Sequence, residues 1–164
     1  MQKYTLAPEY ELEAALPADA EALARLQEAM ALETEHLRLE AATLRAGVAA
    51  LLADPHKGIY YKITHQNQVV GCVLTTFEWS DWRNGQILWI QSLYILPAHR
   101  GKKLYSATYR YFQALVLQRP DWCGIRLYVD KTNQAARAVY QALGMDNGHY
   151  EMFEWIALPD KPVH

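Results

Sequence analysis

Apolar residues recur every three or four positions between Pro17 and Asp54, which is typical of amphipathic helices. The spacing predicts one helix from Pro17 to Met30 and a second from about Glu33, ending before Asp54-Pro55. Ahead of them, residues 9–15 alternate weakly between polar and apolar side chains. We interpret that segment as an edge strand.

After Gly58 the period changes to that of strands. Three segments rich in β-branched and aromatic residues are separated by polar turns at 65–68 and 82–85, the second of which contains the turn dipeptide Asn84-Gly85. The pattern predicts three adjacent antiparallel strands, over residues 59–64, 69–79 and 86–96.

Helices and strands then alternate to the end of the chain. We expect a helix from near Gly101 to before Pro120 and a continuous apolar strand over 124–129, covered on both sides. A helix over 132–143, stopped by Gly144, and a final aromatic strand over 150–158 follow. The order β-α-α-β-β-β-α-β-α-β predicts an α/β (α+β) sandwich in one domain, 1–164, with residues 1–8 as an N-terminal arm.

Composition narrows the class of protein. The 164 residues are 51% hydrophobic and carry a net charge of −2, which argues against a nucleic-acid-binding surface. No segment resembles a signal or a membrane span, so we expect a cytoplasmic protein. Cys72 and Cys123 lie in apolar runs and outside any Cys/His cluster, so we expect reduced, buried thiols and no metal.

The segment from Pro97 to Ser106 joins a strand directly to a helix through a short loop. A helix start directs backbone N–H groups and the positive end of the helix dipole at one point, which suits a phosphate or pyrophosphate. Arg100, Lys102 and Lys103 would add positive charge there. The alternative is a basic, solvated helix start without a ligand.

Asn133 and Tyr140 form a second candidate pair. They are seven residues apart, which is two helical turns, so both side chains lie on one helix face roughly 10 Å apart. Such a face could hold an extended polar ligand. Alternatively, Asn133 caps the helix and Tyr140 is a core aromatic residue.

Taken together, these motifs carry a resemblance to a known family. A strand, Pro-x-x-Arg-Gly-x-x-Leu, a helix, a strand and then Asn-x-x-Ala-x-x-x-Tyr-x-x-Leu-Gly-Met resemble the GNAT family of N-acetyltransferases from about Tyr10 to Trp155. The resemblance implies the acyl-CoA N-acyltransferase sandwich, a mixed and mostly antiparallel sheet with helices on both faces. It also implies a split between strands 86–96 and 124–129 that admits acetyl-CoA.

The resemblance further implies roles for individual residues. Backbone groups of Leu93, Tyr94 and Ile95 would pair with the pantetheine arm, which Asn133 would also contact. Tyr140 would protonate the leaving thiolate as general acid. The amine would attack directly in a ternary complex, without a metal. The pyrophosphate would be held by Arg100, Gly101, Lys102, Lys103, Leu104, Tyr105 and Ser106.

One departure concerns that phosphate loop. The family places small residues, mostly glycine, where this chain has Lys103 and Tyr105. The Lys103 side chain would either narrow the phosphate site or contribute its charge. We expect acetyl-CoA to bind, because Gly101 and the basic run remain.

The acceptor site is expected to combine carboxylates with aromatic rings, which suit a cationic amine. Glu78, with Trp79 and Trp82 beside it, and Glu33, with His36, are the candidates for binding, and either carboxylate or a water could act as the base. Alternatively, the tryptophans are structural and the acids are solvated. The resemblance extends to the diamine and polyamine acetyltransferase branch, which has acids where this chain has Gln91 and Ser92; Gln91 is a further candidate.

The sequence therefore predicts an acetyl-CoA-dependent N-acetyltransferase that acts on a primary amine of a small molecule. A non-catalytic acyl-CoA sensor and a protein or peptide N-acetyltransferase are the alternatives. We expect no nucleic-acid or membrane partner. A homodimer is expected from the aromatic segment Tyr150 to Trp155.

Overall fold

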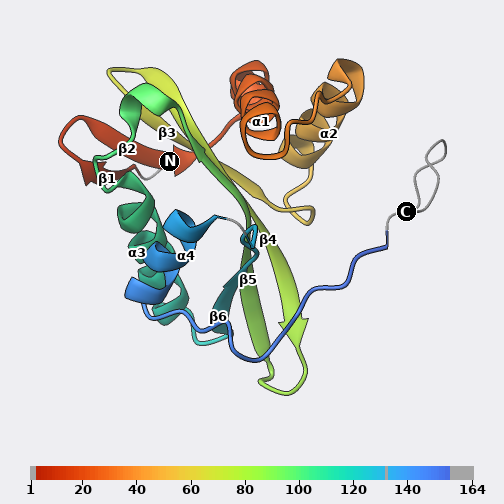
Figure 1. The fold of residues 1–164 in the computed structure, drawn as a ribbon, viewed down its shortest axis with the longest axis vertical. Helices are drawn as coiled ribbons and strands as arrows, with labels where there is room; N and C mark the ends of the chain where they lie inside the picture. Colours follow the sequence, from red (N-terminus) through yellow and green to blue (C-terminus); the bar gives the residue numbers. More distant parts are fainter. Residues whose placement is uncertain (1–2, 132, 156–164) are drawn as a thin grey trace. The chain divides into compact units, whose positions relative to one another are not determined.

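The computed structural model describes residues 3–131 and 133–155 (Figure 1). Two compact units make up the chain, residues 1–128 and residues 129–164. The first unit contains the whole sheet and three of the α-helices, and the second contains the last helix. The prediction of one domain over the whole chain stays a prediction.

A six-stranded sheet forms the first unit, in the spatial order β1-β2-β3-β4-β5-β6. Every neighbouring pair is antiparallel except β5 and β6, which are parallel. The mixed, mostly antiparallel sheet is therefore confirmed. The strands are β1 (Tyr4–Ala7), β2 (Tyr10–Ala14), β3 (Ile59–His65), β4 (Gln68–Ser80), β5 (Gly85–Ile95) and β6 (Trp122–Leu127).

The N-terminal segment differs from its prediction. Residues 4–7 form a strand instead of an arm, and β2 pairs with both β1 and β3, so β2 is not an edge strand. Pro8 and Glu9 turn the chain between β1 and β2, with Glu9 in the left-handed region at φ 65°. A strand of four residues is too short to show a clear alternation.

The first two helices break at a different point from the predicted one. Helix α1 spans Ala20–Glu35 and α2 spans Ala41–Ala53. His36 ends α1 in the left-handed conformation, and the Glu40 side chain caps α2 by accepting hydrogen bonds from Ala42 and Thr43. Glu33 therefore belongs to the last turn of α1, whereas the sequence placed it at the start of the second helix.

The two faces of the sheet are covered by different helices. Tyr60 packs in a core cluster with Leu23 of α1 and Val48 of α2. Its neighbour Tyr61 contacts Phe112 of α3 (Leu104–Leu117), with ring centroids 5.1 Å apart. Because successive strand residues point to opposite faces, α3 lies on the face opposite to α1 and α2. This arrangement confirms helices on both faces.

Strand β5 continues beyond the end of β6, whose last residue, Leu127, is paired with Ile90. β6 pairs with Gln86–Ile90 of β5, and within residues 3–131 no strand pairs with Gln91–Ile95 on that side. On the β4 side, the register shifts between Leu74 and Thr75, so Gln91 is an extra residue in β5. Such a bulge bends a strand and re-aims its side chains. The C-terminal part of β5 thus has an unpaired edge, and the predicted split between two diverging strands stays a prediction.

β6 is less buried than predicted. All six of its residues are half-buried, whereas a strand covered on both sides would be fully buried. The charge of Arg126 accounts for part of the difference, at its own position, because a guanidinium requires polar partners or water.

In the second unit, α4 spans Gln134–Ala142. Asn133 caps it, and Gly144 follows at φ 84°, as is typical of a helix end. The predicted strand over 150–158 is wrong for residues 150–155, which have no regular secondary structure; residues 156–158 lie outside the described residues. Four large side chains of this segment are exposed: Tyr150, Met152, Phe153 and Trp155. No helix among the described residues is long and apolar enough to span a bilayer.

Candidate active site

The loop before α3 has the conformation of an anion site. Gly101 has φ 75° with nothing near its missing side chain, and Lys103 has φ 59°. Lys103, the N-cap residue, gives no side-chain cap to α3, and the first turn of the helix contains no acid. The positive helix end is therefore not neutralised by a carboxylate within the helix.

Arg100 joins this loop to two other elements. Its Nη1 and Nη2 donate to the two Glu33 carboxylate oxygens, at 2.7 and 2.9 Å, and its Nε donates to the carbonyl of Ile95, at 2.8 Å. Tyr94 donates its hydroxyl to Glu33 at 2.8 Å, and the guanidinium lies 5.3 Å from the Tyr94 ring. The end of α1, the end of β5 and the loop are thus connected.

These contacts change the acid–base properties of Glu33. The hydrogen bonds from Arg100 and Tyr94 lower the pKa of the Glu33 carboxyl from its usual value. Burial and the Glu33 carboxylate raise the pKa of the Tyr94 phenol. A carboxylate with a lowered pKa is a weak base.

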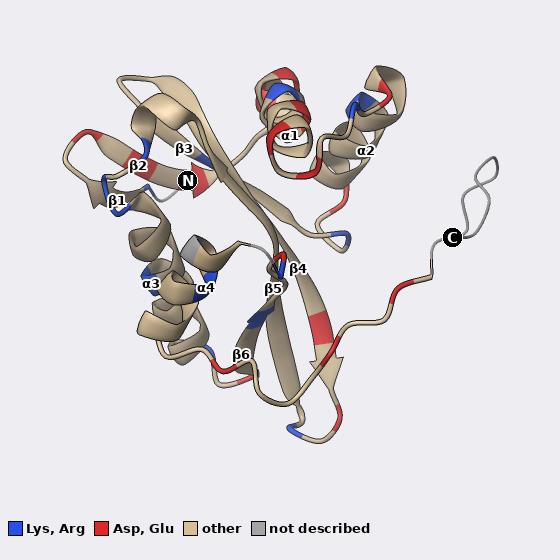
Figure 2. Ribbon diagram, in the orientation of Figure 1, with Lys and Arg blue, Asp and Glu red and all other residues tan. Residues whose placement is uncertain are grey.

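A second polar group lies on β4, β5 and β6. Trp89 Nε1 and Arg126 Nη1 donate to the two oxygens of Glu78, at 2.5 and 2.6 Å. Gln91 donates to the hydroxyl of Thr76, at 2.6 Å, and accepts a hydrogen bond from Tyr128. The acidic segment of β4 and the basic segment of β6 can be followed in Figure 2. We call this group the strand cluster: Thr76, Glu78, Trp89, Gln91, Arg126 and Tyr128.

The strand cluster lies on the same sheet face as α1 and α2. Thr76 and Glu78 alternate in step with Cys72, which belongs to the core cluster beneath those helices. Cys72 of β4 is paired with Tyr94 of β5. Glu78 lies six positions further along β4, which is roughly 20 Å of strand. Glu33, bound to Tyr94, and Glu78 therefore lie toward opposite ends of this face and do not form one carboxylate pair.

The structure does not bring the predicted tryptophans to Glu78. Trp79 follows Glu78 on the strand and points to the opposite face, and its side chain is 59% exposed. Trp82 lies in the turn after β4 and is 87% exposed. The aromatic partner of Glu78 is Trp89. His36, the third predicted residue, is the exposed C-cap of α1.

Four members of the strand cluster were not predicted as site residues: Thr76, Trp89, Arg126 and Tyr128. The spacing of these residues in the sequence could have identified them. Thr76 and Glu78, Trp89 and Gln91, and Arg126 and Tyr128 are each two positions apart in a strand, so each pair shares a face.

Two predicted residues lie in the second unit. The Asn133 Oδ1 accepts a hydrogen bond from the backbone N–H of Ala136 at 3.0 Å, so the residue caps α4. Burial raises the pKa of the Tyr140 phenol to about 12. This phenol therefore remains protonated at neutral pH, as a general acid must be.

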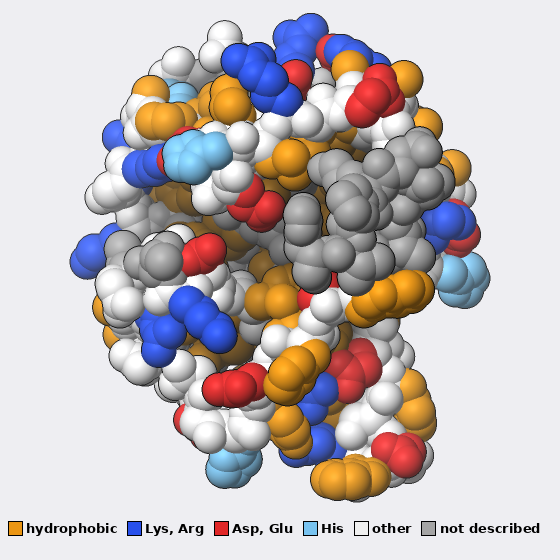
Figure 3. Space-filling view, turned by 45° about the vertical axis from the view of Figure 1, so that its right-hand side comes forward, with side chains coloured by type: hydrophobic (Ala, Val, Ile, Leu, Met, Phe, Trp, Pro, Cys, Tyr) orange, Lys and Arg blue, Asp and Glu red, His pale blue; other side chains and the backbone are white. Residues whose placement is uncertain are grey.

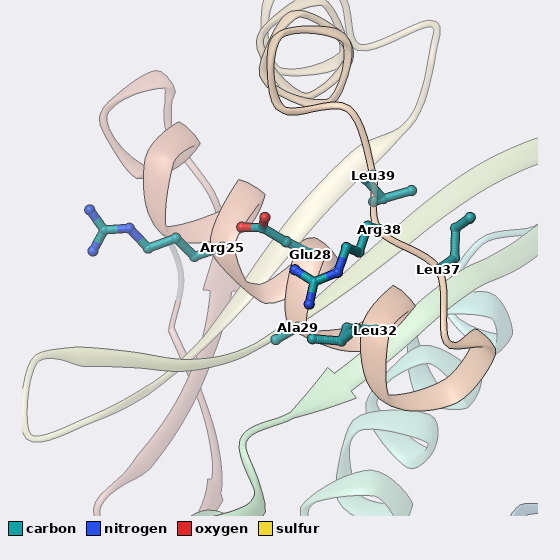
Figure 4. Close-up of a pocket in the computed structure, with 7 residues that line it drawn as sticks. All are labelled: Arg25, Glu28, Ala29, Leu32, Leu37, Arg38 and Leu39. Atoms are coloured by element: carbon teal, nitrogen blue, oxygen red, sulfur yellow. The ribbon is translucent and has the colours of Figure 1, made fainter.

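A pocket of about 380 Å³ lies between α1 and the loop that follows it. Figure 4 shows Arg38 lying across α1, beside Glu28 and Leu32. The residues that face the sheet, such as Leu23 and Gln27, do not line it, so it opens on the outer side of α1. None of the predicted site residues lines this pocket. Among residues 3–131 and 133–155, no group of three acids, histidines or cysteines could hold a metal ion.

The arrangement of the mixed sheet, the unpaired edge of β5 and the basic helix start defines an acyl-CoA N-acyltransferase sandwich. Residues 20–145 match the model of the "Acetyltransferase (GNAT) family". A solved structure described as a possible acetyltransferase from Clostridium difficile 630 is 37% identical, with TM-score 0.84, covering 91% of this chain and 98% of that one. The chain belongs to the GNAT acetyltransferase family, and it is an acetyltransferase.

More distant structures share the fold. A ribosomal-protein-alanine N-acetyltransferase from Brucella melitensis biovar Abortus 2308 is 15% identical, with TM-score 0.72, covering 90% of this chain and 99% of that one. The aminoglycoside N-acetyltransferase AAC(6')-Iy, in complex with CoA, is 12% identical, with TM-score 0.69, covering 96% and 98%. No protein with a curated description matches the chain. These two acceptors differ, so the fold alone does not identify the acceptor.

Proposed function

We propose that the protein transfers an acetyl group from acetyl-CoA to a primary amine of a small molecule, by direct attack in a ternary complex. The single observation that carries the proposal is the unpaired edge of β5. Gln91–Ile95 of β5 lack a strand neighbour on the β6 side within the first unit, directly before the basic loop of α3.

The cofactor would extend along that edge. Backbone groups of Leu93, Tyr94 and Ile95 would bind the pantetheine arm as an added strand. The start of α3, from Gly101 to Ser106, would bind the pyrophosphate through backbone N–H groups, with Lys102 and Lys103 supplying charge. Because Arg100 is held by Glu33 and Ile95, we assign it the role of positioning this loop at the edge of the phosphate site.

In the reaction, the nitrogen lone pair of the amine attacks the thioester carbonyl carbon. The new C–N bond forms, the C–S bond breaks, and sulfur keeps the electron pair. The proton lost by the amine passes to water, and Tyr140 protonates the thiolate and is reprotonated by solvent. Asn133 would contact the pantetheine through the amide group that also caps α4.

For the base, Glu78 is better placed than Glu33. Both carboxylates are paired with an arginine, but the partners of Glu33 are Arg100, in the phosphate loop, and Tyr94, at the end of β5 next to it. Glu78 lies in the strand cluster with Gln91, the first β5 residue beyond the β6 pairing. We propose that a water relays the proton from the amine toward Glu78.

The acceptor would lie on the strand cluster, with Glu78 and Gln91 among its contacts. The core cluster beneath α1 and α2 contains Cys72 and Tyr94, toward the other end of this face. Figure 3 shows acidic and basic side chains interspersed with apolar ones on the side of the molecule drawn. A protein acceptor would instead require an extended groove for a peptide backbone.

Two further expectations accompany this function. The two free cysteines fit the reducing cytoplasm, where we place the protein. We also propose a homodimer that buries the apolar side chains of residues 150–155. Sedimentation of the full chain beside a variant with Phe153 and Trp155 changed to serine tests it: a dimer that dissociates in the variant is expected, and a monomeric wild type contradicts it.

The function is tested by calorimetric titration with acetyl-CoA and by thiol release with a panel of amines. We expect micromolar binding, and thiol release with at least one amine. Tyr140→Phe should lower kcat about 100-fold and leave acetyl-CoA binding unchanged, because only the proton donor is lost. Tyr4→Phe is the matched control, since the Tyr4 ring contacts Tyr111 in the sheet unit and has no proposed role. Equal kcat in Tyr140→Phe and the wild type would overturn the acid assignment.

A further inference from the structure

We infer that Tyr10 and His99 are positioning residues for the acetyl-CoA site, because together they hold the loop before α3, residues 100–103, from the face of the sheet that α3 covers. The inference rests on the proposed function, in which this loop binds the pyrophosphate. Three observations support it: the hydrogen bond between the two residues, the contact of Lys102 with the same tyrosine, and the separate attachment of Arg100.

Tyr10 is fixed within the sheet. It is the first residue of β2, and its side chain is only 5% exposed. It is paired with His65 of β3, and the two rings are stacked with their centroids 4.5 Å apart. His65 lies four positions from Tyr61, whose ring contacts α3, so His65 and its partner Tyr10 point to the face that α3 covers.

His99 joins this tyrosine to the chain segment that leads into the loop. His99 is the last residue of the short 3-10 helix η2 (Pro97–His99), two positions before Gly101. Its Nδ1 and the Tyr10 hydroxyl share a hydrogen bond of 2.9 Å, and the two rings meet edge to face with centroids 5.8 Å apart. The entry of the loop is therefore attached to β2.

Lys102 contacts the same ring from the other side of Gly101. Its Nζ lies 5.9 Å from the centroid of the Tyr10 ring, within the range of a cation–π contact. His99 and Lys102 thus both contact Tyr10, and the turn at Gly101, with φ 75°, lies between them in the chain. One buried side chain therefore holds the loop before and after its turn.

Arg100, between these two contacts, is attached on the opposite face of the sheet. Its guanidinium binds Glu33 of α1, at 2.7 and 2.9 Å. Backbone N–H groups bind a phosphate more tightly when they are already oriented, because ordering them on binding costs free energy. A loop held from both faces meets this condition. The contact between Tyr10 and His99 should therefore affect the affinity for acetyl-CoA and not the chemical step.

Tyr10→Phe tests the inference with a minimal change, because it removes the hydroxyl and keeps the ring that stacks on His65. We expect the Kd for acetyl-CoA, measured by calorimetry, to rise about fivefold, the effect of one hydrogen bond, with kcat within about twofold of the wild type. Tyr61→Phe is the matched control. It is the same substitution on the same face, roughly 13 Å further along β3, and it should change neither constant.

Two substitutions of His99 separate its polar atom from its shape. In His99→Asn an amide atom bonded to Cγ takes the place of Nδ1, whereas His99→Leu has similar branching without a polar atom. We expect His99→Leu to raise the Kd for acetyl-CoA about fivefold and His99→Asn to stay within about twofold of the wild type. Adding Tyr10→Phe to His99→Leu should cause no further loss, because both remove the same contact.

Hydrogen exchange of the ligand-free protein tests the positioning without acetyl-CoA. Amides of residues 98–104 should exchange faster in Tyr10→Phe than in the wild type, and at the wild-type rate in Tyr61→Phe. Faster exchange with an unchanged Kd would show a purely structural contact and overturn the inference. So would additive effects of Tyr10→Phe and His99→Leu, which would mean that the two side chains act separately.

The outcomes distinguish this inference from the proposed function. Acetyl-CoA binding and thiol release that are unchanged in Tyr10→Phe would overturn the inference and leave the proposed function standing. A wild-type protein that neither binds acetyl-CoA nor releases thiol would overturn the proposed function, and the role of Tyr10 and His99 with it.

Discussion

Two ends of one sheet face carry the same kind of ion pair in different settings. At one end, Glu33 and Arg100 connect α1, β5 and the loop before α3, next to a core covered by α1 and α2. At the other end, Glu78 and Arg126 lie across β5 among half-buried side chains. Each ion pair joins a carboxylate to a guanidinium, but the residues around the two pairs differ.

The difference indicates separate tasks. Three donors of Arg100 are used within the protein, and they fix the loop where a pyrophosphate would bind. The Glu78–Arg126 pair connects strands that already pair with β5 through their backbones, so it adds little to the sheet. We therefore propose that the first pair positions the cofactor loop and that the second belongs to the acceptor end of the face.

Removing the two carboxylates in turn should separate these tasks most clearly. Glu33→Ala should raise KM for acetyl-CoA about fivefold to tenfold, because the loop loses its anchor, with little change in KM for the amine. Glu78→Ala should raise KM for the amine by about tenfold and leave that for acetyl-CoA unchanged. Steady-state kinetics with each substrate varied measures both. If both variants affected the same KM, the two ends would not have separate tasks.

Substitutions of Lys103 should have a smaller effect, in the loop where the cofactor would bind. Its backbone is in the left-handed region, so Lys103→Gly should stabilise the protein by about 1 kcal/mol in urea unfolding. Lys103→Ala keeps the strained conformation and removes the charge. It should weaken acetyl-CoA binding without the gain in stability. Equal stabilities of the two variants would contradict the strain argument.

The pH dependence of stability gives a further test of the Glu33–Arg100 pair. The pKa of Glu33 is lowered on folding, so the pair stabilises the protein above the unfolded pKa of about 4.3 and loses this effect as pH falls through the lower folded pKa. Since both side chains are about 40% exposed, we expect Glu33→Gln to lower Tm by only about 2 °C at pH 7. The difference should shrink below about pH 4. If the Tm difference between Glu33→Gln and the wild type stayed constant down to pH 3, the Glu33–Arg100 pair would not be its cause.

The smallest effect is expected on the opposite face of the sheet. The hydroxyl of Thr108, on α3, is fully buried without a hydrogen-bond partner among the described residues. Thr108→Val replaces the hydroxyl by a methyl group of similar volume and so removes the free-energy cost of burying an unpaired polar group. It should stabilise the protein by no more than about 0.5 kcal/mol. Kinetic constants should not change. A loss of stability above about 1 kcal/mol would indicate a partner for the hydroxyl, and altered kinetics would show that this face contributes to the site.

Much of the fold could be predicted from the sequence. The turns at 65–68 and 82–85 fixed the meander of β3, β4 and β5, because Asn and Gly residues mark hairpins strongly. The position of the break between α1 and α2 could not be found. Helical spacing continues through residues 31–35, and a single left-handed residue, His36, ends the helix.

The candidate site was predicted less completely. The cofactor loop was recognisable because its motif is contiguous in sequence. The strand cluster depends on which side chains share a face of three strands, and the register of β5 and β6 is visible only in the folded sheet. The interpretation of residues 77–82 as one aromatic and acidic patch overlooked the alternation that separates Trp79 from Glu78.

We propose that acetyl-CoA and a small amine react directly with each other on the sheet face that carries the strand cluster. The most direct measurement is the paired yield of free CoA thiol and N-acetylated amine, with intact-mass analysis of the protein in the same sample. We predict equal amounts of the two products and no acetylated protein. Binding of acetyl-CoA without thiol release from any amine would contradict the claim and indicate a sensor, and acetylated protein would indicate a covalent route.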